Sequence, residues 1–70
     1  MKYSISTKPE GTVIKIALAE DHPLLSDTIT YALNKQPDFE VVIQAQNGKT
    51  LIKQLKKVHT DVILLDINIV

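Results

Sequence analysis

The chain has 70 residues, enough for at most one small domain, and a chain of this size buries only about 60% of the surface that it exposes when unfolded. Eight lysines balance eight acidic residues, so the net charge is zero and the composition gives no general indication of nucleic acid, an anionic membrane or a polyanionic substrate as a partner. Cysteine is absent and two isolated histidines cannot form a zinc cage, so any metal must be bound by oxygen atoms.

The first twelve residues are polar and contain no apolar stretch of the kind that signal peptides and membrane spans need. Lys2, Lys8, Pro9 and Gly11 fall within this segment. We therefore expect residues 1–12 to be a flexible leader and residues 13–70 to form the folded part of a cytoplasmic protein that does not contact a membrane.

A strand and a helix are predicted next. Residues 13–19 are almost continuously apolar, which is typical of a strand buried on both faces of a parallel sheet. In the run Glu20-Asp21-His22-Pro23 that follows, an acid can cap a helix, and proline suits the first helical turn. The helix should end near residues 36–38. Its apolar positions are Leu25, Ile29, Ala32 and Leu33, and its polar side carries Ser26, Asp27, Thr30 and Asn34.

The second half repeats this alternation. Residues 39–44 read as a strand, and Asn47-Gly48 as a turn that can also cap the next helix. Residues 62–65 are fully apolar and predict a third strand that ends at Asp66. The helix between them has an apolar stripe of Leu51, Ile52, Leu55 and Val58, with Lys49, Lys53, Lys56 and Lys57 toward solvent.

The β-α-β-α-β order predicts an α/β fold with a parallel sheet and right-handed crossovers. If the second and third strands lie on opposite sides of the first, the spatial order is 2-1-3. This order begins the flavodoxin-like sheet 2-1-3-4-5, in which ligands bind in the crevice at the carboxyl ends of strands one and three.

Glu20, Asp21 and Asp66 follow those two strand ends. Adjacent strands lie about 4.8 Å apart, so the three carboxylates should meet and repel one another unless a hard cation lies between them. Mg²⁺ is the natural cation, because it binds one or two carboxylates, water and phosphate oxygens. The backbone carbonyl of Asn68 is placed to reach the same ion. A carboxylate at such a site can attack a phosphoryl group and form an aspartyl phosphate.

Each of these residues also has a simpler interpretation. Asp21 could merely cap the first helix, and Glu20 could be a solvated loop acid. Asp66 and Asn68 could be ordinary turn residues. His22 and His59 are interpreted as surface residues. The coincidence of three acids at one predicted crevice favours the metal site over the separate alternatives.

Two segments carry a family resemblance. Residues 17–24, Ala-Leu-Ala-Glu-Asp-His-Pro-Leu, resemble the opening of response-regulator receiver domains of the NarL/FixJ type, and residues 61–68 resemble their phosphorylation-site strand. The likeness covers residues 13–68. It implies that Asp66 takes a phosphoryl group from the phosphohistidine of a sensor histidine kinase. It also implies that Asp21 ligates Mg²⁺, Glu20 assists through water and the Asn68 carbonyl completes the metal shell. A receiver of this kind is a signalling domain rather than an enzyme.

The chain departs from the family pattern after Asn68. Ile69 and Val70 stand where a methionine and a proline usually follow, and the sequence stops before the hydroxyl residue and the lysine that complete a receiver site. We therefore expect a partial receiver without direct contact to nucleic acid. Its third strand, residues 62–65, should have an open apolar edge through which the chain forms a homo-oligomer.

Two alternatives come from other functional classes. In one, the chain is a self-associating interaction piece without a signalling role, and Mg²⁺-dependent phosphorylation would distinguish the two. In the other, it is a Toprim-type nucleic-acid enzyme, which also places acids after the first and a later strand. That fold expects an Asp-x-Asp pair, which Asp66-Ile67-Asn68 does not provide.

Overall fold

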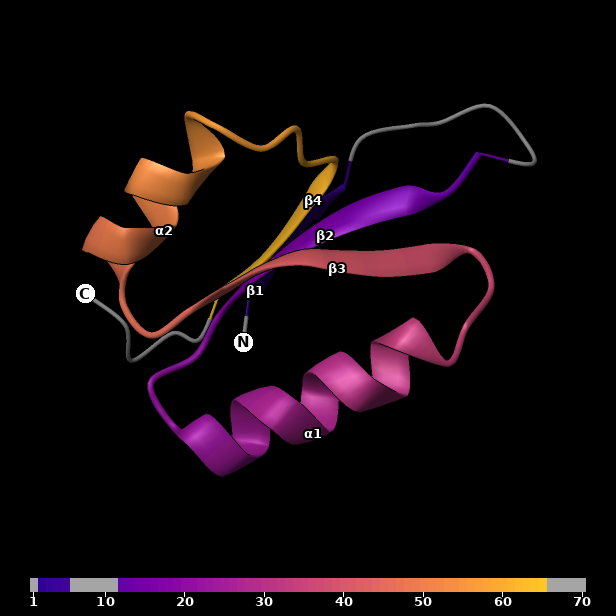
Figure 1. Ribbon diagram of the computed structural model, residues 1–70, viewed down its shortest axis with the longest axis horizontal. Coiled ribbons are helices and arrows are strands. Elements are labelled where there is room, and N and C mark those ends of the chain that lie inside the picture. The colour runs from indigo at the N-terminus through magenta and orange to yellow at the C-terminus, as the bar shows by residue number, and fades with distance from the viewer. Residues whose placement is uncertain (1, 6–11, 66–70) are drawn as a thin grey trace.

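In the computed structural model, which describes residues 2–5 and 12–65, a four-stranded sheet carries one helix on each side (Figure 1). The strands lie in the order β1-β4-β2-β3. In chain order the elements are β1 (Lys2–Ile5), β2 (Ile14–Ala19), α1 (Pro23–Asn34), β3 (Phe39–Ala45), α2 (Gly48–Leu55) and β4 (Val62–Leu65).

Three of the strands form the predicted parallel sheet. β2 is central and pairs parallel with β3 on one side and with β4 on the other. The spatial order of these three strands is the expected 2-1-3, and the α/β fold with alternating strands and helices is confirmed. A register shift between Ile16 and Ala17 leaves Val42 as an extra residue of β3, because Ile16 pairs with Val41 and Ala17 with Ile43.

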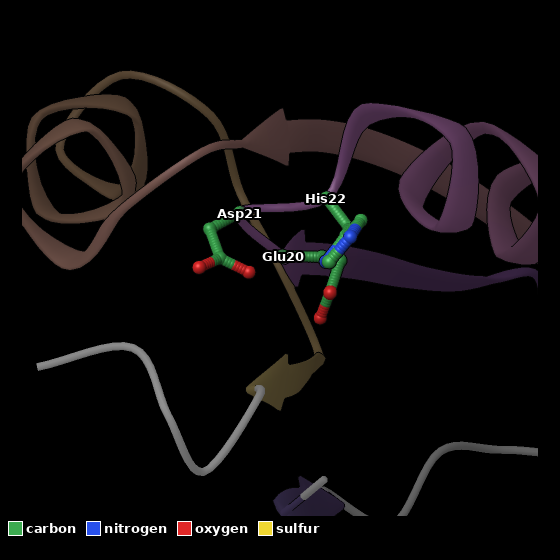
Figure 2. Close-up of side chains that lie close together, drawn as sticks. All are labelled: Glu20, Asp21 and His22. Carbon is green, nitrogen blue, oxygen red and sulfur yellow. The ribbon is translucent and has the colours of Figure 1, made fainter.

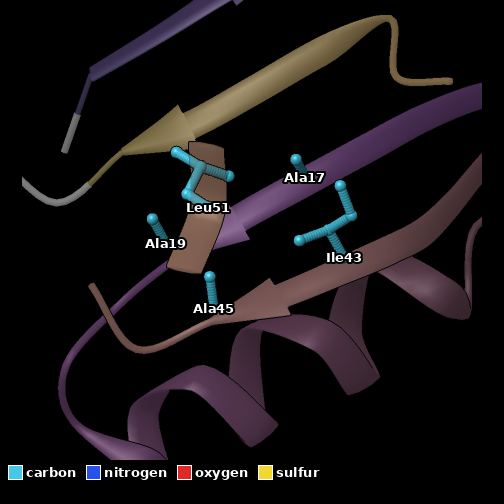
Figure 3. Close-up of a cluster of buried hydrophobic side chains, with 5 residues drawn as sticks. All are labelled: Ala17, Ala19, Ile43, Ala45 and Leu51. Atoms are coloured by element: carbon cyan, nitrogen blue, oxygen red, sulfur yellow. The ribbon is translucent and has the colours of Figure 1, made fainter. Parts of the chain in front are cut away.

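The core lies on both faces of β2, as expected for a strand covered by helices on both sides. Leu18, Ala17 and Ala19 are fully buried. On the α2 side, Leu51 lies over small residues of β2 and β3 (Figure 3). The apolar cluster there consists of Ala17, Ala19, Ile43, Ala45 and Leu51, with Val42, Leu55, Val58, Ile63 and Leu65 packed against it.

α1 faces the sheet differently from our expectation. Ser26 is its buried residue, whereas Leu25, which we placed on the core side, is 45% exposed. Ser26 and Leu33 are seven residues apart, so they lie on one face of the helix, and Leu33 is half-buried. Helical periodicity predicted the helix correctly but not which of its sides faces the sheet. Leu24, Leu25 and Tyr31 form a second apolar side, and this side stays exposed.

α2 follows the predicted pattern more closely. Asn47 is its N-cap, and the Asn47 side chain accepts a hydrogen bond from the Thr50 N–H at 2.8 Å. The predicted stripe is right at Leu51 and Leu55 but wrong at Ile52, which is 58% exposed. Neither this helix nor any other among the described residues is long and apolar enough to cross a membrane.

β1 pairs antiparallel with the outer edge of β4, from Lys2 opposite Leu65 to Ile5 opposite Val62. We expected residues 62–65, which form β4, to have an open edge through which the chain forms a homo-oligomer. Because β1 occupies this edge, that expectation is wrong. The strand lies inside the segment that we interpreted as a leader. Its sequence signal is weak, because a short edge strand needs backbone pairing and not the apolar run of a buried strand. The division of the chain at residue 12 stays a prediction.

Candidate functional site

Glu20 is the first residue after β2 and is buried. Its N–H donates to the Ala45 carbonyl at 2.9 Å, which ties the end of β2 to the end of β3. Its side chain continues the alternation of Ile16 and Leu18, and the residue is 2% exposed. The interpretation of Glu20 as a solvated loop acid is therefore wrong. A carboxylate in such surroundings is stable only with polar or charged partners, so the buried end of β2 is a place for a polar site.

Asp21 and His22 complete a tight group with Glu20. One ligand atom from each residue lies within 4.8 Å of the others, and Asp21 and His22 are exposed. Figure 2 shows that the three side chains project to the same side of the loop. The N-cap of α1 is His22 and not Asp21, so the capping role that we considered for Asp21 is not found. Pro23 occupies the first turn as expected.

The carboxylate oxygens of Glu20 and Asp21 are suitable ligands for Mg²⁺. Mg²⁺ prefers oxygen ligands, holds several waters and binds through one or two carboxylates. The Asp21 carboxylate is exposed and therefore accessible to an ion, and a carboxylate oxygen of Glu20 lies within 4.8 Å of it. The His22 imidazole is a nitrogen donor of the kind that zinc, nickel or copper favours, so it adds little for Mg²⁺. The sequence analysis interpreted His22 as a surface residue, and His22 is exposed; what it did not consider is that the imidazole lies beside the two acids.

A polar pocket of about 180 Å³ lies beside Glu20. Gln44 of β3 connects the strand side of the pocket to the helix side. The Gln44 Nε2 donates to Ser26 Oγ of α1 at 2.7 Å and to Asp27 Oδ1 of α1 at 2.8 Å. The sequence analysis placed Ser26 and Asp27 on the solvent side of the helix. The signal that could have found them is that Ser26 comes three residues after Pro23, on the face above the strand ends. The pocket is lined by Glu20, Pro23, Ser26, Asp27, Gln44, Ala45 and Gln46.

The strand that leads to Asp66 ends next to the strand that leads to Glu20. Ala19 and Leu65 are register partners in the parallel pair of β2 and β4. Glu20 follows Ala19 and Asp66 follows Leu65 in the sequence. Asp66 and Asn68 themselves lie outside the described residues, so their predicted roles stay predictions.

Comparison with known proteins gives a family match over most of the chain. Residues 16–70 match the response regulator receiver domain model. The chain is 37% identical over 60 residues to the nitrate/nitrite response regulator protein NarP of Escherichia coli (strain K12), which covers 86% of the chain and 28% of that protein. It is 36% identical over 55 residues to the transcriptional regulatory protein DegU of Brevibacillus brevis, which covers 79% of the chain and 23% of that protein.

The relatives also include proteins with another printed function. The protein-glutamate methylesterase/protein-glutamine glutaminase 2 of Methanospirillum hungatei JF-1 is 36% identical over 56 residues, covering 80% of the chain and 16% of that protein. No solved structure gave a significant match. The chain spans 28% or less of the length of these relatives, so the similarity extends over only a minor part of each of them. With the family match over residues 16–70 and the observed 2-1-3 parallel sheet, the chain belongs to the response regulator receiver domain family.

Proposed function

We propose that this chain is the phosphoacceptor part of a two-component response regulator, in which Asp66 takes a phosphoryl group from the phosphohistidine of a sensor histidine kinase. The observation that supports it most is the register of Ala19 with Leu65, because the residues that follow them are Glu20 and Asp66. Membership of the receiver family supplies the reaction class.

The proposed transfer balances without a further reactant. A carboxylate oxygen of Asp66 forms a bond to phosphorus while the bond from phosphorus to the histidine nitrogen breaks. The electron pair of that bond stays on the imidazole, whose other nitrogen carries a proton, so the ring leaves as neutral histidine and the product on this chain is a mixed anhydride. The chain supplies the acceptor and the surroundings, and the kinase supplies the activated group.

Four residues are proposed to hold Mg²⁺ beside the acceptor: Asp21, Glu20, Asp66 and Asn68. When bound, the ion would offset the negative charge that accumulates on the phosphoryl oxygens. Asp21 is exposed and would bind directly, whereas the buried Glu20 would act through a water molecule. The hydrogen bond from the Glu20 N–H to Ala45 fixes the start of this loop relative to the sheet, so its carboxylates are positioned before the ion arrives.

The test is phosphorylation by a small donor. The chain is incubated with acetyl phosphate and Mg²⁺, and its intact mass is followed over time. We expect the mass to rise by one phosphoryl group in the parent and in Asp38→Asn, which changes one exposed charge outside the site. Asp66→Asn should not gain the group, because its amide is not a nucleophile.

Two results would contradict the proposal. Phosphate on Asp66→Asn would place the acceptor elsewhere. Equal incorporation with and without Mg²⁺ would remove the ion from the reaction. If the parent takes no phosphate at all, the non-signalling alternative is favoured.

The partner and the location follow from the same reaction. A histidine kinase that supplies the phosphoryl group must reach Asp66 from the cell interior, so we propose a cytoplasmic location. The chain spans 28% or less of the length of these relatives, so transcription regulation is not proposed for residues 1–70. Direct binding of DNA by residues 1–70 is not part of the proposal.

A further inference from the structure

The polar pocket beside Glu20 is distinct from the proposed metal group. It lies between the start of α1 and the carboxyl end of β3, two segments that meet at the same edge of the sheet (Figure 1). Asp21 and His22, which complete the metal group, do not line it. Asp27 and Gln44 line it and lie outside the metal group. The phosphoryl transfer proposed above therefore leaves this pocket without a role.

The pocket presents mainly hydrogen-bond acceptors. The Gln44 amide uses both of its protons within the wall, because its Nε2 donates to Ser26 Oγ at 2.7 Å and to Asp27 Oδ1 at 2.8 Å. The group that Gln44 can offer to a ligand is therefore its carbonyl oxygen. Asp27 adds an exposed carboxylate, and the buried Glu20 adds a second negative charge to the lining. A ligand that suits these walls is a hydrogen-bond donor with a positive charge.

The lysines whose side chains the structure describes lie away from this pocket. Lys15 is bonded at the amino edge of the sheet, and Lys35 Nζ lies 4.7 Å from the centroid of the Tyr31 ring. The four other lysines belong to α2 and the turn after it, on the opposite side of the sheet from α1 (Figure 1). The sequence contains no arginine. The pocket is thus open to a cation from another molecule.

We propose that the pocket binds a guanidinium group. Guanidinium is planar, keeps its charge at any ordinary pH and presents five N–H donors in a fixed fork, whereas an ammonium is a compact and strongly hydrated point charge. The acceptors of the pocket come from two elements, α1 and β3, so a ligand with several separated donors can reach both at once. Its weakly hydrated faces can lie against Pro23 and Ala45, the apolar part of the lining.

The size of the pocket limits how much of a ligand it holds. Its volume is about 180 Å³, whereas sites that enclose most of a small molecule usually measure about 300–1,000 Å³. The pocket therefore accommodates a head group whose remaining atoms stay outside. A free arginine derivative and an arginine side chain of a polypeptide both present guanidinium in this way, and the experiment below distinguishes them.

A matched pair of probes tests the choice of guanidinium. Nα-acetylarginine amide and Nα-acetyllysine amide carry the same charge on the same backbone, and each is titrated into the ¹⁵N-labelled chain at constant ionic strength without Mg²⁺. We expect the arginine probe to shift the backbone amide signals of Ser26, Asp27 and Gln44 saturably, and to leave Thr60 at the opposite edge unchanged. Its affinity should exceed that of the lysine probe at least about tenfold, because more charge-assisted hydrogen bonds form.

Two substitutions with the same charge change test the place of binding. Asp27→Asn keeps the carbonyl that accepts from Gln44 but removes the charge, so it should weaken binding of the arginine probe about tenfold or more. Asp38→Asn, at the amino edge of the sheet, is the matched control and should keep the affinity of the parent. Circular dichroism verifies the fold of both variants. If Asp27→Asn does not fold, the comparison of the two probes on the parent decides.

Three results would overturn the proposal: equal affinity for the two probes, Asp27→Asn binding as tightly as the parent, or signal shifts spread evenly over the chain. The peptide Gly-Gly-Arg-Gly-Gly amide then identifies the source of the group. Binding of the peptide more tightly than the arginine probe would support an arginine side chain of a partner polypeptide. Equal affinity of the peptide and the probe would support a small guanidinium ligand, and either outcome supports the proposed site.

Discussion

Lys15 and Asp61 are bonded to each other twice at the amino edge of the sheet. The Lys15 N–H donates to Asp61 Oδ2 at 3.0 Å, and the Asp61 N–H donates to the Lys15 carbonyl at 2.8 Å. His59 Nε2 lies 2.9 Å from the second carboxylate oxygen. Because Asp61 immediately precedes β4, these bonds fix the register that brings Ala19 beside Leu65 at the opposite edge. The position of the candidate site thus depends on a residue at the far end of the strands.

We predict that Asp61→Ala destabilises the chain by about 1–3 kcal/mol, because the Lys15 N–H loses its acceptor and the Asp61 side chain is only 4% exposed. Asp61→Asn retains a side-chain carbonyl and should cost less. Asp38→Ala is the control, since Asp38 is exposed and surface changes usually stay within about 0.5 kcal/mol. Urea unfolding followed by circular dichroism measures all three. Equal losses for Asp61→Ala and Asp38→Ala would contradict the role given to Asp61.

Mg²⁺ binding should depend on Asp21 much more than on His22. We predict that isothermal titration detects weak Mg²⁺ binding to the parent and little heat for Asp21→Asn, because a direct carboxylate ligand is lost. His22→Asn should bind Mg²⁺ as the parent does but lose affinity for Ni²⁺, since nickel favours imidazole nitrogen.

The control for these titrations removes one acid at a distance. Asp38→Asn makes the same charge change before β3, at the amino edge of the sheet. Its Mg²⁺ affinity should match that of the parent. A loss as large as that of Asp21→Asn would mean that the binding responds to net charge and not to a site.

Strand and helix order could be predicted from the sequence because hydrophobic runs and turn residues are local signals. Residues 13–19 and 62–65 were long enough apolar runs to identify buried strands, and the parallel order 2-1-3 followed from the alternation with helices. The rotation of α1 could not be read in this way. The buried Ser26 of α1 accepts a hydrogen bond from Gln44 of β3, and a partner 18 residues away in the sequence leaves no mark on helical periodicity.

The candidate site was predictable in part for a similar reason. The prediction that Glu20 and Asp21 lie beside the carboxyl end of β4 followed from sheet topology alone. The burial of Glu20 depends on a strand alternation that continues one residue past the apolar run, which composition does not reveal. β1 was missed because an edge strand is specified by a free neighbour and not by its own sequence.

Small residues under α2 should be sensitive to added volume. Ala19 is fully buried on the side of the sheet where Leu51 packs, as Figure 3 shows. We predict that Ala19→Leu costs about 1–3 kcal/mol or more through overpacking, and that Leu51→Ala costs about 2–5 kcal/mol through a cavity. Ala32→Leu on the exposed side of α1 is the control. Thermal unfolding should leave that variant near the parent, and an equally stable Ala19→Leu would show that the helix can move away from the sheet.

The last prediction concerns the link between α1 and β3. Gln44 donates to Ser26 Oγ, and Ser26 is 4% exposed, so Gln44→Leu leaves a buried hydroxyl without this donor. We expect a loss of about 1–3 kcal/mol in the free energy of unfolding. The second bond, to Asp27, is exposed and should add little.

A double-mutant cycle separates this bond from its surroundings. Ser26→Ala alone should cost about 1 kcal/mol, but in the Gln44→Leu background it should cost less, because the hydroxyl that lacked its donor is then removed. The coupling energy between the two positions should reach about 0.5–1.5 kcal/mol. Gln46→Leu, which lines the same pocket and is exposed, is the matched control and should show no coupling to Ser26. Strict additivity of Ser26→Ala and Gln44→Leu would show that the hydrogen bond does not hold α1 against β3, and that the helix owes its orientation to the half-buried Ile29 and Leu33.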